Sequence, residues 1–175
     1  MTAQSQSAGR RGLRIAGTVP VISSGASYVR SARPADIDAM LRIIDTYVQR
    51  HFLLPRTYDE IAGHIETWRI AELDGEVVGC AALRDFGGGL GELRSLSVLE
   101  DAYGRGLGEL LVRAIVGDAE RAGISHLFVI TRIPRYFARH GFMPMAMEDV
   151  PVELGADRVP WPRRSGEGRA MELPL

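Results

Sequence analysis

Three glycines at alternate positions stand directly before an apolar helical segment in DAYGRGLGELLVRAI, residues 101–115. Glycine permits a sharp backbone turn and the close approach of a ligand. Such a turn before a helix directs several free backbone N–H groups to one point, where the helix dipole also favours negative charge. Gly104, Gly106 and Gly108 therefore predict a cradle for a phosphate or diphosphate group.

Two other phosphate-binding loops do not fit these residues. A nucleotide P-loop needs Lys followed by Ser or Thr after its last glycine, and Glu109-Leu110 stands there instead. A dinucleotide-binding fingerprint needs glycine at position 109, and it follows the first strand of its fold. A glycine-rich turn that binds no ligand is the remaining alternative.

The flanking segments predict the elements that position this turn. Residues 91–98 (GELRSLSV) alternate in polarity and predict a strand, and residues 126–131 (HLFVIT) predict a strand buried on both faces. A strand, a helix and a second strand in this order predict a right-handed parallel crossover. The apolar face of the helix is expected to carry Leu107, Leu110, Leu111, Ala114 and Ile115.

The earlier segments predict an antiparallel first half. Residues 27–32 predict a strand, and residues 34–51 predict a helix with a proline in its first turn. Thr57 and Glu60 have the spacing of a capping box on a second, short helix. Two strands then flank Asp74-Gly75, which is the strongest short hairpin signal.

The remaining segments complete the predicted order. FGGGLG, residues 86–91, predicts a flexible loop, and Pro134 begins a short helix that ends at Gly141. Two strands close the chain, the last of them within AMELPL. The order is β-α-α-β-β-β-α-β-α-β-β, and the fold class is mixed α/β with a parallel β-α-β unit in its second half.

Composition indicates a soluble globular protein. The chain has 175 residues with 46% hydrophobic and 25% charged residues, which predicts one domain with a substantial core. No apolar run is long enough to span a bilayer. The single cysteine, Cys80, lies in an apolar run, so we expect a small core residue in a reducing cytoplasm.

Charge is distributed unevenly along the chain. Residues 1–35 hold five arginines and no acid, whereas the remainder has 16 basic and 22 acidic residues. An acidic body argues against nucleic-acid binding, which needs a basic surface. All 21 basic residues are arginine, so any group that pairs with an anion here is Arg or His.

The first 26 residues have no hydrophobic period and predict a disordered tail ahead of one domain over residues 27–175. A targeting segment is the alternative, because Arg10-Arg11 precedes a mildly apolar stretch. Pro20 and several serines interrupt that stretch, which favours the tail.

Two motifs resemble those of the GCN5-related N-acetyltransferases, the GNAT superfamily. LSVLEDAYGRGLGELL, residues 96–111, is similar to its acetyl-CoA-binding motif, and FARHGF, residues 137–142, to its second signature. Tyr103 stands where the first motif usually has Gln or Arg. The resemblance covers about residues 28–150 and implies the acyl-CoA N-acyltransferase fold with acetyl-CoA as co-substrate.

Three stretches narrow the resemblance to the acetyltransferase domain of bacterial N-acetylglutamate synthases, in the short, stand-alone form. They are LLPRTYDEI (53–61), GELRSLSV (91–98) and YFARHGF (136–142). This resemblance implies direct transfer of acetyl from acetyl-CoA to the α-amine of L-glutamate, the first step toward arginine. It also implies a small-molecule amino-acid substrate, a cytoplasmic location, no membrane partner and, as is common in the family, a homodimer. Control by arginine through a kinase-like domain is not expected.

The resemblance also implies roles for residues around the glycine turn. Glu92 is the candidate base, since burial beside the cofactor would raise the pKa of a carboxyl group, and a solvated strand residue is the alternative. Backbone N–H groups near Leu96, Ser97 and Val98 would meet the oxyanion and pair with the pantetheine arm. The diphosphate would bind the turn made by Gly104, Arg105, Gly106, Leu107, Gly108 and Glu109.

A dicarboxylate substrate requires cations. Arg56 matches the arginine of the LLPRT motif and is the first candidate for a substrate carboxylate, with a surface arginine before a helix cap as the alternative. Arg94 shares a strand face with Glu92, so it would reach the substrate or pair with Glu92. The spacing of Arg132, Arg135 and Arg139 is more typical of a solvated face.

For two further roles, the general acid and a metal ligand, the sequence has no candidate at the expected position or spacing. Phe137 occupies the position of a tyrosine acid in many relatives, and Tyr136 beside it is interpreted as a packing residue, which leaves the general acid unassigned. The histidines at 51, 64, 126 and 140 have no ligand spacing, so no metal site is expected.

Two alternative functions stay open. The first is an acetyltransferase of the same fold that uses another small amine or a peptide N-terminus, and an acidic rim with Arg56 facing away would favour it. The second is a regulatory module that binds CoA without turnover.

Overall fold

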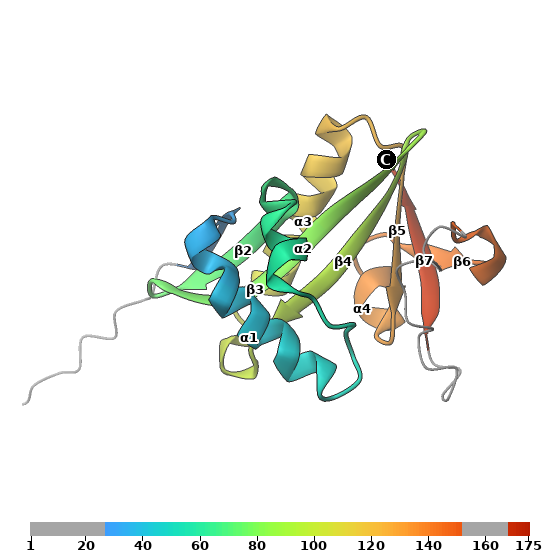
Figure 1. The fold of residues 1–175 in the computed structure, drawn as a ribbon. Coiled ribbons are helices and arrows are strands. Elements are labelled where there is room, and N and C mark those ends of the chain that lie inside the picture. The colour runs from blue at the N-terminus through green and yellow to red at the C-terminus, as the bar shows by residue number, and fades with distance from the viewer. Residues whose placement is uncertain (1–26, 152–167) are drawn as a thin grey trace, which may run out of the picture.

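A single mixed sheet forms the centre of the computed structural model, which describes residues 27–151 and 168–175; the predicted tail over residues 1–26 lies outside these ranges. The seven strands stand in the order β1-β2-β3-β4-β5-β7-β6 (Figure 1). Their bounds are β1 Ser27–Ser31, β2 Trp68–Leu73, β3 Glu76–Gly87, β4 Leu90–Val98, β5 His126–Thr131, β6 Met143–Met145 and β7 Arg169–Pro174. Only β4 and β5 pair in parallel among these strands; the other neighbours are antiparallel. The predicted fold class and crossover are confirmed.

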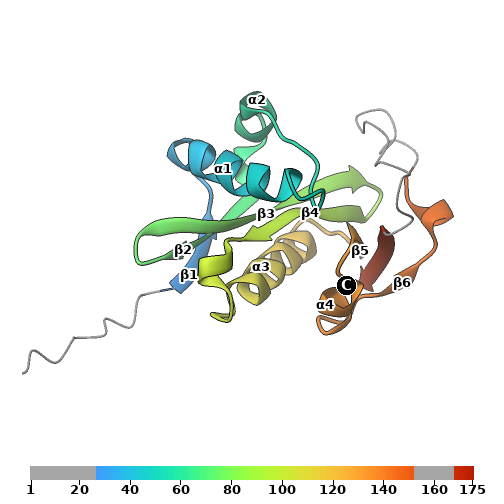
Figure 2. The ribbon, with the colours of Figure 1, turned by 90° about the horizontal axis from the view of Figure 1, so that it is seen from below.

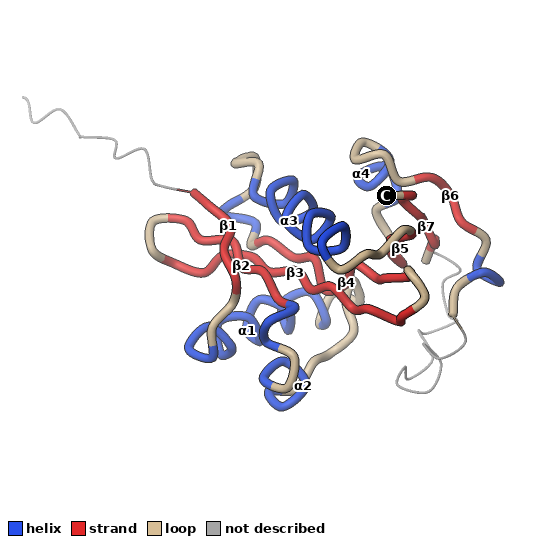
Figure 3. The backbone as a smooth tube through the Cα atoms, turned by 90° about the horizontal axis from the view of Figure 1, so that it is seen from above, coloured by secondary structure: helices blue, strands red, loops and turns tan. Residues whose placement is uncertain are grey.

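Helices cover both faces of the sheet. A 3₁₀ turn over Pro34–Asp36 leads into α1, Ile37–Val48, and α2, Tyr58–Ala62, follows; both lie on one face (Figure 2). The other face carries α3, Leu107–Arg121, and α4, Pro134–Ala138 (Figure 3). Each face has its own buried cluster, one around Trp68, Met40 and Ile44 and the other around Leu93, Leu111 and Ile115.

Local signals in the sequence account for the ends of several elements. The Thr57 hydroxyl accepts a hydrogen bond from the Glu60 N–H, and the Glu60 carboxylate accepts one from the Thr57 N–H, so the predicted capping box begins α2. Asp74 and Gly75 both have positive φ, as the predicted tight hairpin requires. The segment predicted as a flexible loop is instead largely strand, because β3 continues through Gly87 and β4 begins at Leu90.

One predicted core position of α3 is wrong. Leu110 is 37% exposed, whereas Leu107, Leu111 and Ile115 are buried as predicted. Val112 takes the expected place of Leu110 and is 2% exposed. The ridge of residues 107, 111 and 115 faces the sheet, and an apolar residue on either flank of that ridge fits the helical period. Packing buries the flank that carries Val112.

The parallel pair β4–β5 opens into a fork. Backbone pairing runs from Leu90↔His126 to Glu92↔Phe128 and ends there, although β4 continues to Val98. Figure 1 shows the two strands adjacent at one end and apart at the other. The backbone groups of the second half of β4 are therefore not used by β5, and they face the space where the site lies.

The apolar helices of this fold are short. Within the described residues, no helix has the length and hydropathy needed to cross a membrane.

Candidate active site

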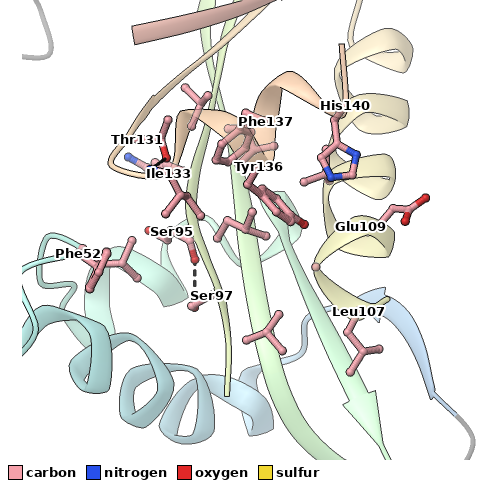
Figure 4. A pocket seen from close by; sticks show the side chains of 18 of the residues that line it. Phe52, Ser95, Ser97, Leu107, Glu109, Thr131, Ile133, Tyr136, Phe137 and His140 are labelled. Carbon is pink, nitrogen blue, oxygen red and sulfur yellow. Dashed lines mark hydrogen bonds between the residues drawn. The ribbon is translucent and has the colours of Figure 1, made fainter. Parts of the chain in front are cut away.

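A pocket of about 1310 Å³ occupies the fork between β4 and β5. Its walls come from the second half of β4, the glycine turn with the first turns of α3, α4, and the loop after α1 (Figure 4). Ligand pockets in proteins commonly have volumes of about 300–1,000 Å³. The fork is thus large enough for an extended co-substrate and a small acceptor together.

Glu92 lies at the apex of the fork. It is the last residue of β4 that pairs with β5, it is 2% exposed, and it lines the pocket. The alternative of a solvated strand residue is therefore wrong. A carboxylate that is buried in a wall of a substrate pocket has the placement that a general base needs.

A bulge in β4 follows Glu92 and changes the direction of the strand. Cys80 pairs with Ser97 and Ala82 with Arg94, so two residues of β4 stand opposite one residue of β3. Ser95 has a φ of 56°, a left-handed conformation that is unfavourable for a residue with a side chain. Because of the bulge, Ser97 joins Arg94 on the face toward α1.

Two side chains hold the Ser95 carbonyl in this conformation. The Ser97 hydroxyl donates to it at 3.2 Å (Figure 4), and the Cys80 thiol lies 4.0 Å from the same oxygen. Burial raises the pKa of the Cys80 thiol to about 12, so the sulfur keeps its proton. Cys80 is fully buried and is a core residue rather than a nucleophile, in agreement with the prediction.

Arg56 and Arg94 converge on this bulge. The Arg56 Nε donates to the Ser95 hydroxyl at 3.3 Å, and both guanidinium groups line the pocket. Burial, followed by the positive charge of Arg56, lowers the pKa of Arg94 to about 10, although the negative charge of Glu92 opposes the shift. Within the described ranges, Arg94 forms no ion pair with Glu92, and its buried Nε has no hydrogen-bond partner. Two like charges held together in a pocket favour the binding of an anion between them.

The glycine turn has the backbone conformation that a cradle requires. Gly104 and Gly106 have φ values of 75° and 73°, and no atom stands within 4 Å of the Cβ that either would carry. Their lack of a side chain is thus a requirement of backbone conformation. Helical hydrogen bonding starts with the Leu110 N–H, which donates to the Gly106 carbonyl at 3.0 Å. The N–H groups of the first turn of α3 precede it and have no helical acceptor.

The predicted cofactor residues lie along one side of the pocket, with one exception. The lining includes Leu96, Ser97, Val98, Gly104, Gly106, Leu107, Gly108 and Glu109. Arg105 is exposed and is not part of the lining, because its position in the turn directs its side chain outward. Its role as a cofactor-binding residue stays a prediction that concerns its backbone N–H alone.

Tyr103 is connected to β4 by a second tyrosine, Tyr47 of α1. The two hydroxyls are 2.7 Å apart, and the Tyr47 hydroxyl also donates to the carbonyl of Val98. Burial raises the pKa of Tyr47, which therefore keeps its proton as a donor. This link joins the end of β4 to the glycine turn, and it gives Tyr103 a structural contact at the position of the usual Gln or Arg.

Comparison with known proteins identifies the family to which this chain belongs. The model of the Acetyltransferase (GNAT) family matches residues 36–142. The chain belongs to the GNAT acetyltransferase family. It is therefore an acyltransferase, and the predicted family, fold and enzyme class are confirmed.

Curated relatives of this acetyltransferase include both short and long chains. An uncharacterized N-acetyltransferase of Chlorobaculum tepidum is 34% identical over 136 residues, covering 78% of this chain and 88% of that protein. The amino-acid acetyltransferase of Mycobacterium tuberculosis is 33% identical over 129 residues, which cover 72% of this chain and 74% of that protein. The match to the amino-acid acetyltransferase of Aeromonas salmonicida, 32% identical, spans 83% of this chain and 33% of that longer protein.

Solved structures show the same fold. N-acetylglutamate synthase from Neisseria gonorrhoeae, complexed with coenzyme A and N-acetyl-glutamate, has a TM-score of 0.76 at 28% identity, covering 86% of this chain and 35% of that chain. Rv2747 from Mycobacterium tuberculosis, in a complex that contains CoA, has a TM-score of 0.74 at 27% identity. The match covers 84% of this chain and 98% of that chain. Both of these structures, which share the fold of this chain, contain coenzyme A.

Sequence reasoning missed several residues of this acetyltransferase's pocket. Arg132, predicted to lie on a solvated face, lines the pocket, donates to the His51 carbonyl at 2.8 Å and stacks on Phe52 with 5.2 Å between guanidinium and ring centre. Arg139 also lines it, whereas Arg135 is exposed outside the lining. Helical spacing alone did not show that α4 begins at the rim of the fork. Among the described residues, no group of His, Cys, Asp or Glu has an arrangement that suits a metal ion.

Proposed function

We propose that this acetyltransferase transfers acetyl from acetyl-CoA to the α-amine of L-glutamate. The observation that carries the proposal is the pair of arginines beside the buried Glu92. A dicarboxylate acceptor brings two negative groups, and Arg56 and Arg94 offer two guanidinium groups in the same pocket. The relatives that are named amino-acid acetyltransferases support an amino acid as the acceptor.

The glycine turn supports acetyl-CoA as the acetyl donor. The left-handed Gly104 and Gly106 leave room at the first turn of α3, where free N–H groups suit a diphosphate. From there the unpaired backbone of β4 runs toward Glu92, and an extended pantetheine arm would pair with it as an added strand. This path would bring a thioester to the apex of the fork.

The reaction then requires three events at the apex. The acceptor amine loses a proton, either to Glu92 or to a water that Glu92 orients, and attacks the thioester carbonyl carbon. A backbone N–H near Leu96 stabilises the oxygen of the tetrahedral intermediate. The carbon–sulfur bond breaks, and the CoA thiolate takes up a proton as N-acetylglutamate forms.

Changing Arg56 to Ala tests the acceptor site. We expect KM for glutamate to rise by about tenfold or more with a smaller change in kcat, because a charge-assisted contact to the acceptor is lost. The measurement is thiol release from acetyl-CoA as glutamate is varied. Arg135→Ala is the matched control, since Arg135 is outside the pocket lining and should leave KM unchanged. An unchanged KM in Arg56→Ala would remove Arg56 from the acceptor site.

Glu92→Gln tests the base. We expect kcat to fall by roughly 10²–10⁴ while the dissociation constant of acetyl-CoA stays near its wild-type value, because the amide keeps the shape of the side chain and cannot take a proton. The two measurements are steady-state thiol release and calorimetric titration with acetyl-CoA. A wild-type kcat in this variant contradicts the role of Glu92.

The cellular location, the pathway and the oligomeric state are parts of the same proposal. N-acetylglutamate would be made in the cytoplasm as the first step toward arginine, by a chain that acts as a homodimer. The alternative acceptors, another small amine or a peptide N-terminus, would be favoured by an acidic rim with Arg56 facing away, whereas Arg56 and Arg94 both line the pocket. A regulatory module without turnover would bind acetyl-CoA and release no thiol with any amino acid.

A further inference from the structure

The third glycine of the turn differs in kind from the other two. Gly104 and Gly106 are required by their positive φ, but Gly108 lies within the first turn of α3, where any residue fits the backbone. A Cβ at position 108 would stand 2.6 Å from the Tyr136 hydroxyl, which is too close for two atoms that do not bond. The absence of a side chain at 108 therefore makes room for that hydroxyl.

Tyr136 packs against the core as the sequence predicts, but its hydroxyl extends beyond this packing toward α3. Its ring is held at its edge by Phe137 and His140, with ring centres 5.3 and 4.8 Å away, and the Arg139 guanidinium lies over it. Figure 4 shows the side chain reaching from α4 toward the first turn of α3. The ring packs against the core, Tyr136 is one of the residues that line the pocket, and its hydroxyl is buried against the backbone of Gly108.

The hydroxyl lacks the partner that a buried phenol normally has. It is excluded from solvent, and within residues 27–151 and 168–175 it makes no hydrogen bond. Buried tyrosine hydroxyls almost always pair, because an unpaired one costs about 1–3 kcal/mol. Burial raises the pKa of Tyr136, so the group is a neutral donor. A donor held without a partner beside free N–H groups suits a ligand that brings an acceptor oxygen.

We propose that the Tyr136 hydroxyl is a further coenzyme-binding group, which donates a hydrogen bond to a diphosphate oxygen at the first turn of α3, and that Gly108 exists to admit it. This inference rests on the proposed use of coenzyme A. It assigns to a side chain part of a cradle that otherwise consists of backbone N–H groups. It also accounts for the third glycine, which backbone conformation does not require.

Calorimetric titration of Tyr136→Phe with coenzyme A and with ADP tests the contact. ADP carries the diphosphate without the pantetheine arm. We expect the dissociation constants of both ligands to rise by about tenfold, with an unchanged or higher midpoint of thermal unfolding without ligand, because only the unpaired hydroxyl is removed. Tyr58→Phe, an exposed tyrosine on α2, is the control and should change neither affinity.

Two results would overturn the contact. Wild-type affinity of Tyr136→Phe for both ligands would show that the hydroxyl is not part of the coenzyme site. If kcat falls while both affinities stay unchanged, the phenol acts in another way, such as protonating the thiolate, and the proposed contact is equally overturned. A loss for coenzyme A without a loss for ADP would place the hydroxyl on the pantetheine arm and overturn the assignment to the diphosphate.

A double-variant cycle tests the pairing with Gly108. Gly108→Ala should lower the unfolding midpoint and weaken coenzyme binding, because its Cβ collides with the hydroxyl. In the Tyr136→Phe background the hydroxyl is gone and the ring carbon that carried it lies 3.5 Å from the new Cβ, an ordinary contact, so the same change should be nearly neutral. Equal effects of Gly108→Ala in both backgrounds would contradict the pairing.

The same titrations separate this inference from the proposed function. If wild-type protein binds coenzyme A but acetylates no glutamate, the acceptor assignment is wrong. The Tyr136 contact is then still tested by the titrations of Tyr136→Phe with coenzyme A and ADP. If wild-type protein binds no coenzyme A, both proposals are wrong.

Discussion

The guanidinium of Arg94 is largely removed from water, and the negative charges of Glu92 and Glu60 offset this cost only in part, because the net effect on its pKa is a decrease. Burial lowers its pKa to about 10, and neighbouring Arg56 adds repulsion. A cation whose pKa is lower in the folded than in the unfolded chain is destabilising below that pKa, because the folded state disfavours the charged form. A role in binding the acceptor, as we propose for Arg94, would account for a residue that lowers stability.

Arg94→Met should raise the unfolding midpoint and weaken acceptor binding at the same time. Methionine fills similar space without charge, so we expect a gain of about 0.5–2 kcal/mol in the free energy of unfolding at pH 7. Differential scanning calorimetry measures the gain, and steady-state kinetics should show a higher KM for glutamate. A variant that is less stable than wild type would contradict the view that the burial of the Arg94 charge is only partly offset.

The pKa of Arg94 also predicts a pH dependence. Binding of N-acetylglutamate should weaken as pH rises through about 10, because Arg94 loses its proton there, and the product has no amine that titrates in this range. Calorimetric titration between pH 8 and about 11 should show the decline in wild type and a flatter profile in Arg94→Met. Parallel profiles would show that another group causes the decline.

At the scale of elements, one strand, β4, carries most of the proposed site. β4 carries Glu92 at the fork, the bulge at Ser95 and the unpaired backbone that follows. The turn after it makes a left-handed bend at Gly104 and Gly106 and begins α3. The strand and the helix thus direct a carboxylate and a set of N–H groups into one pocket.

Gly106→Ala should affect coenzyme binding through the backbone alone. A left-handed residue with a Cβ costs about 1–2 kcal/mol, so the variant should lose that stability, and the strained turn should bind coenzyme A more weakly. Gly88→Ala is the matched control, because Gly88 has a φ of 62°, equally open surroundings and a place in the distant β3–β4 turn. Calorimetry should show equal losses of stability in both variants and a higher dissociation constant for coenzyme A only in Gly106→Ala. Equal coenzyme affinity in the two would contradict the role of the turn.

The elements were predictable from the sequence because their signals are local. The capping box at Thr57, the hairpin at Asp74-Gly75 and the glycine turn each depend on a few neighbouring residues. The alternation of GELRSLSV predicted the strand but not its bulge, since the left-handed Ser95 depends on how β4 pairs with β3.

The parts of the site that were missed depend on how elements are placed. Arg132 faces the pocket because β5 ends at the rim of the fork, and Tyr136 points at α3 because α4 packs beside that helix. Leu110 and Val112 fit the helical period equally well, so only the packed sheet decides which is buried. None of these contacts connects residues that are near in sequence.

At the scale of the whole molecule, the fold divides the work between its two halves. The antiparallel half, β1 to β4 with α1 and α2, holds the arginines and the carboxylate, and the glycine turn with α3 and α4 forms the opposite wall. In the proposed reaction, both substrates would meet where the two halves separate, at Glu92. The selectivity of the molecule is therefore expected to come from the arginines of one half, with the donor held by the other.

A competition experiment tests this account most directly. The protein is incubated with acetyl-CoA and an equimolar mixture of the twenty amino acids, and the acetylated products are identified and quantified by mass spectrometry as thiol is released. We predict N-acetylglutamate as the main product, with its excess over other products reduced in Arg56→Ala. Acetylation of lysine or glycine in preference to glutamate, or thiol release with no acetylated amino acid, would contradict the account.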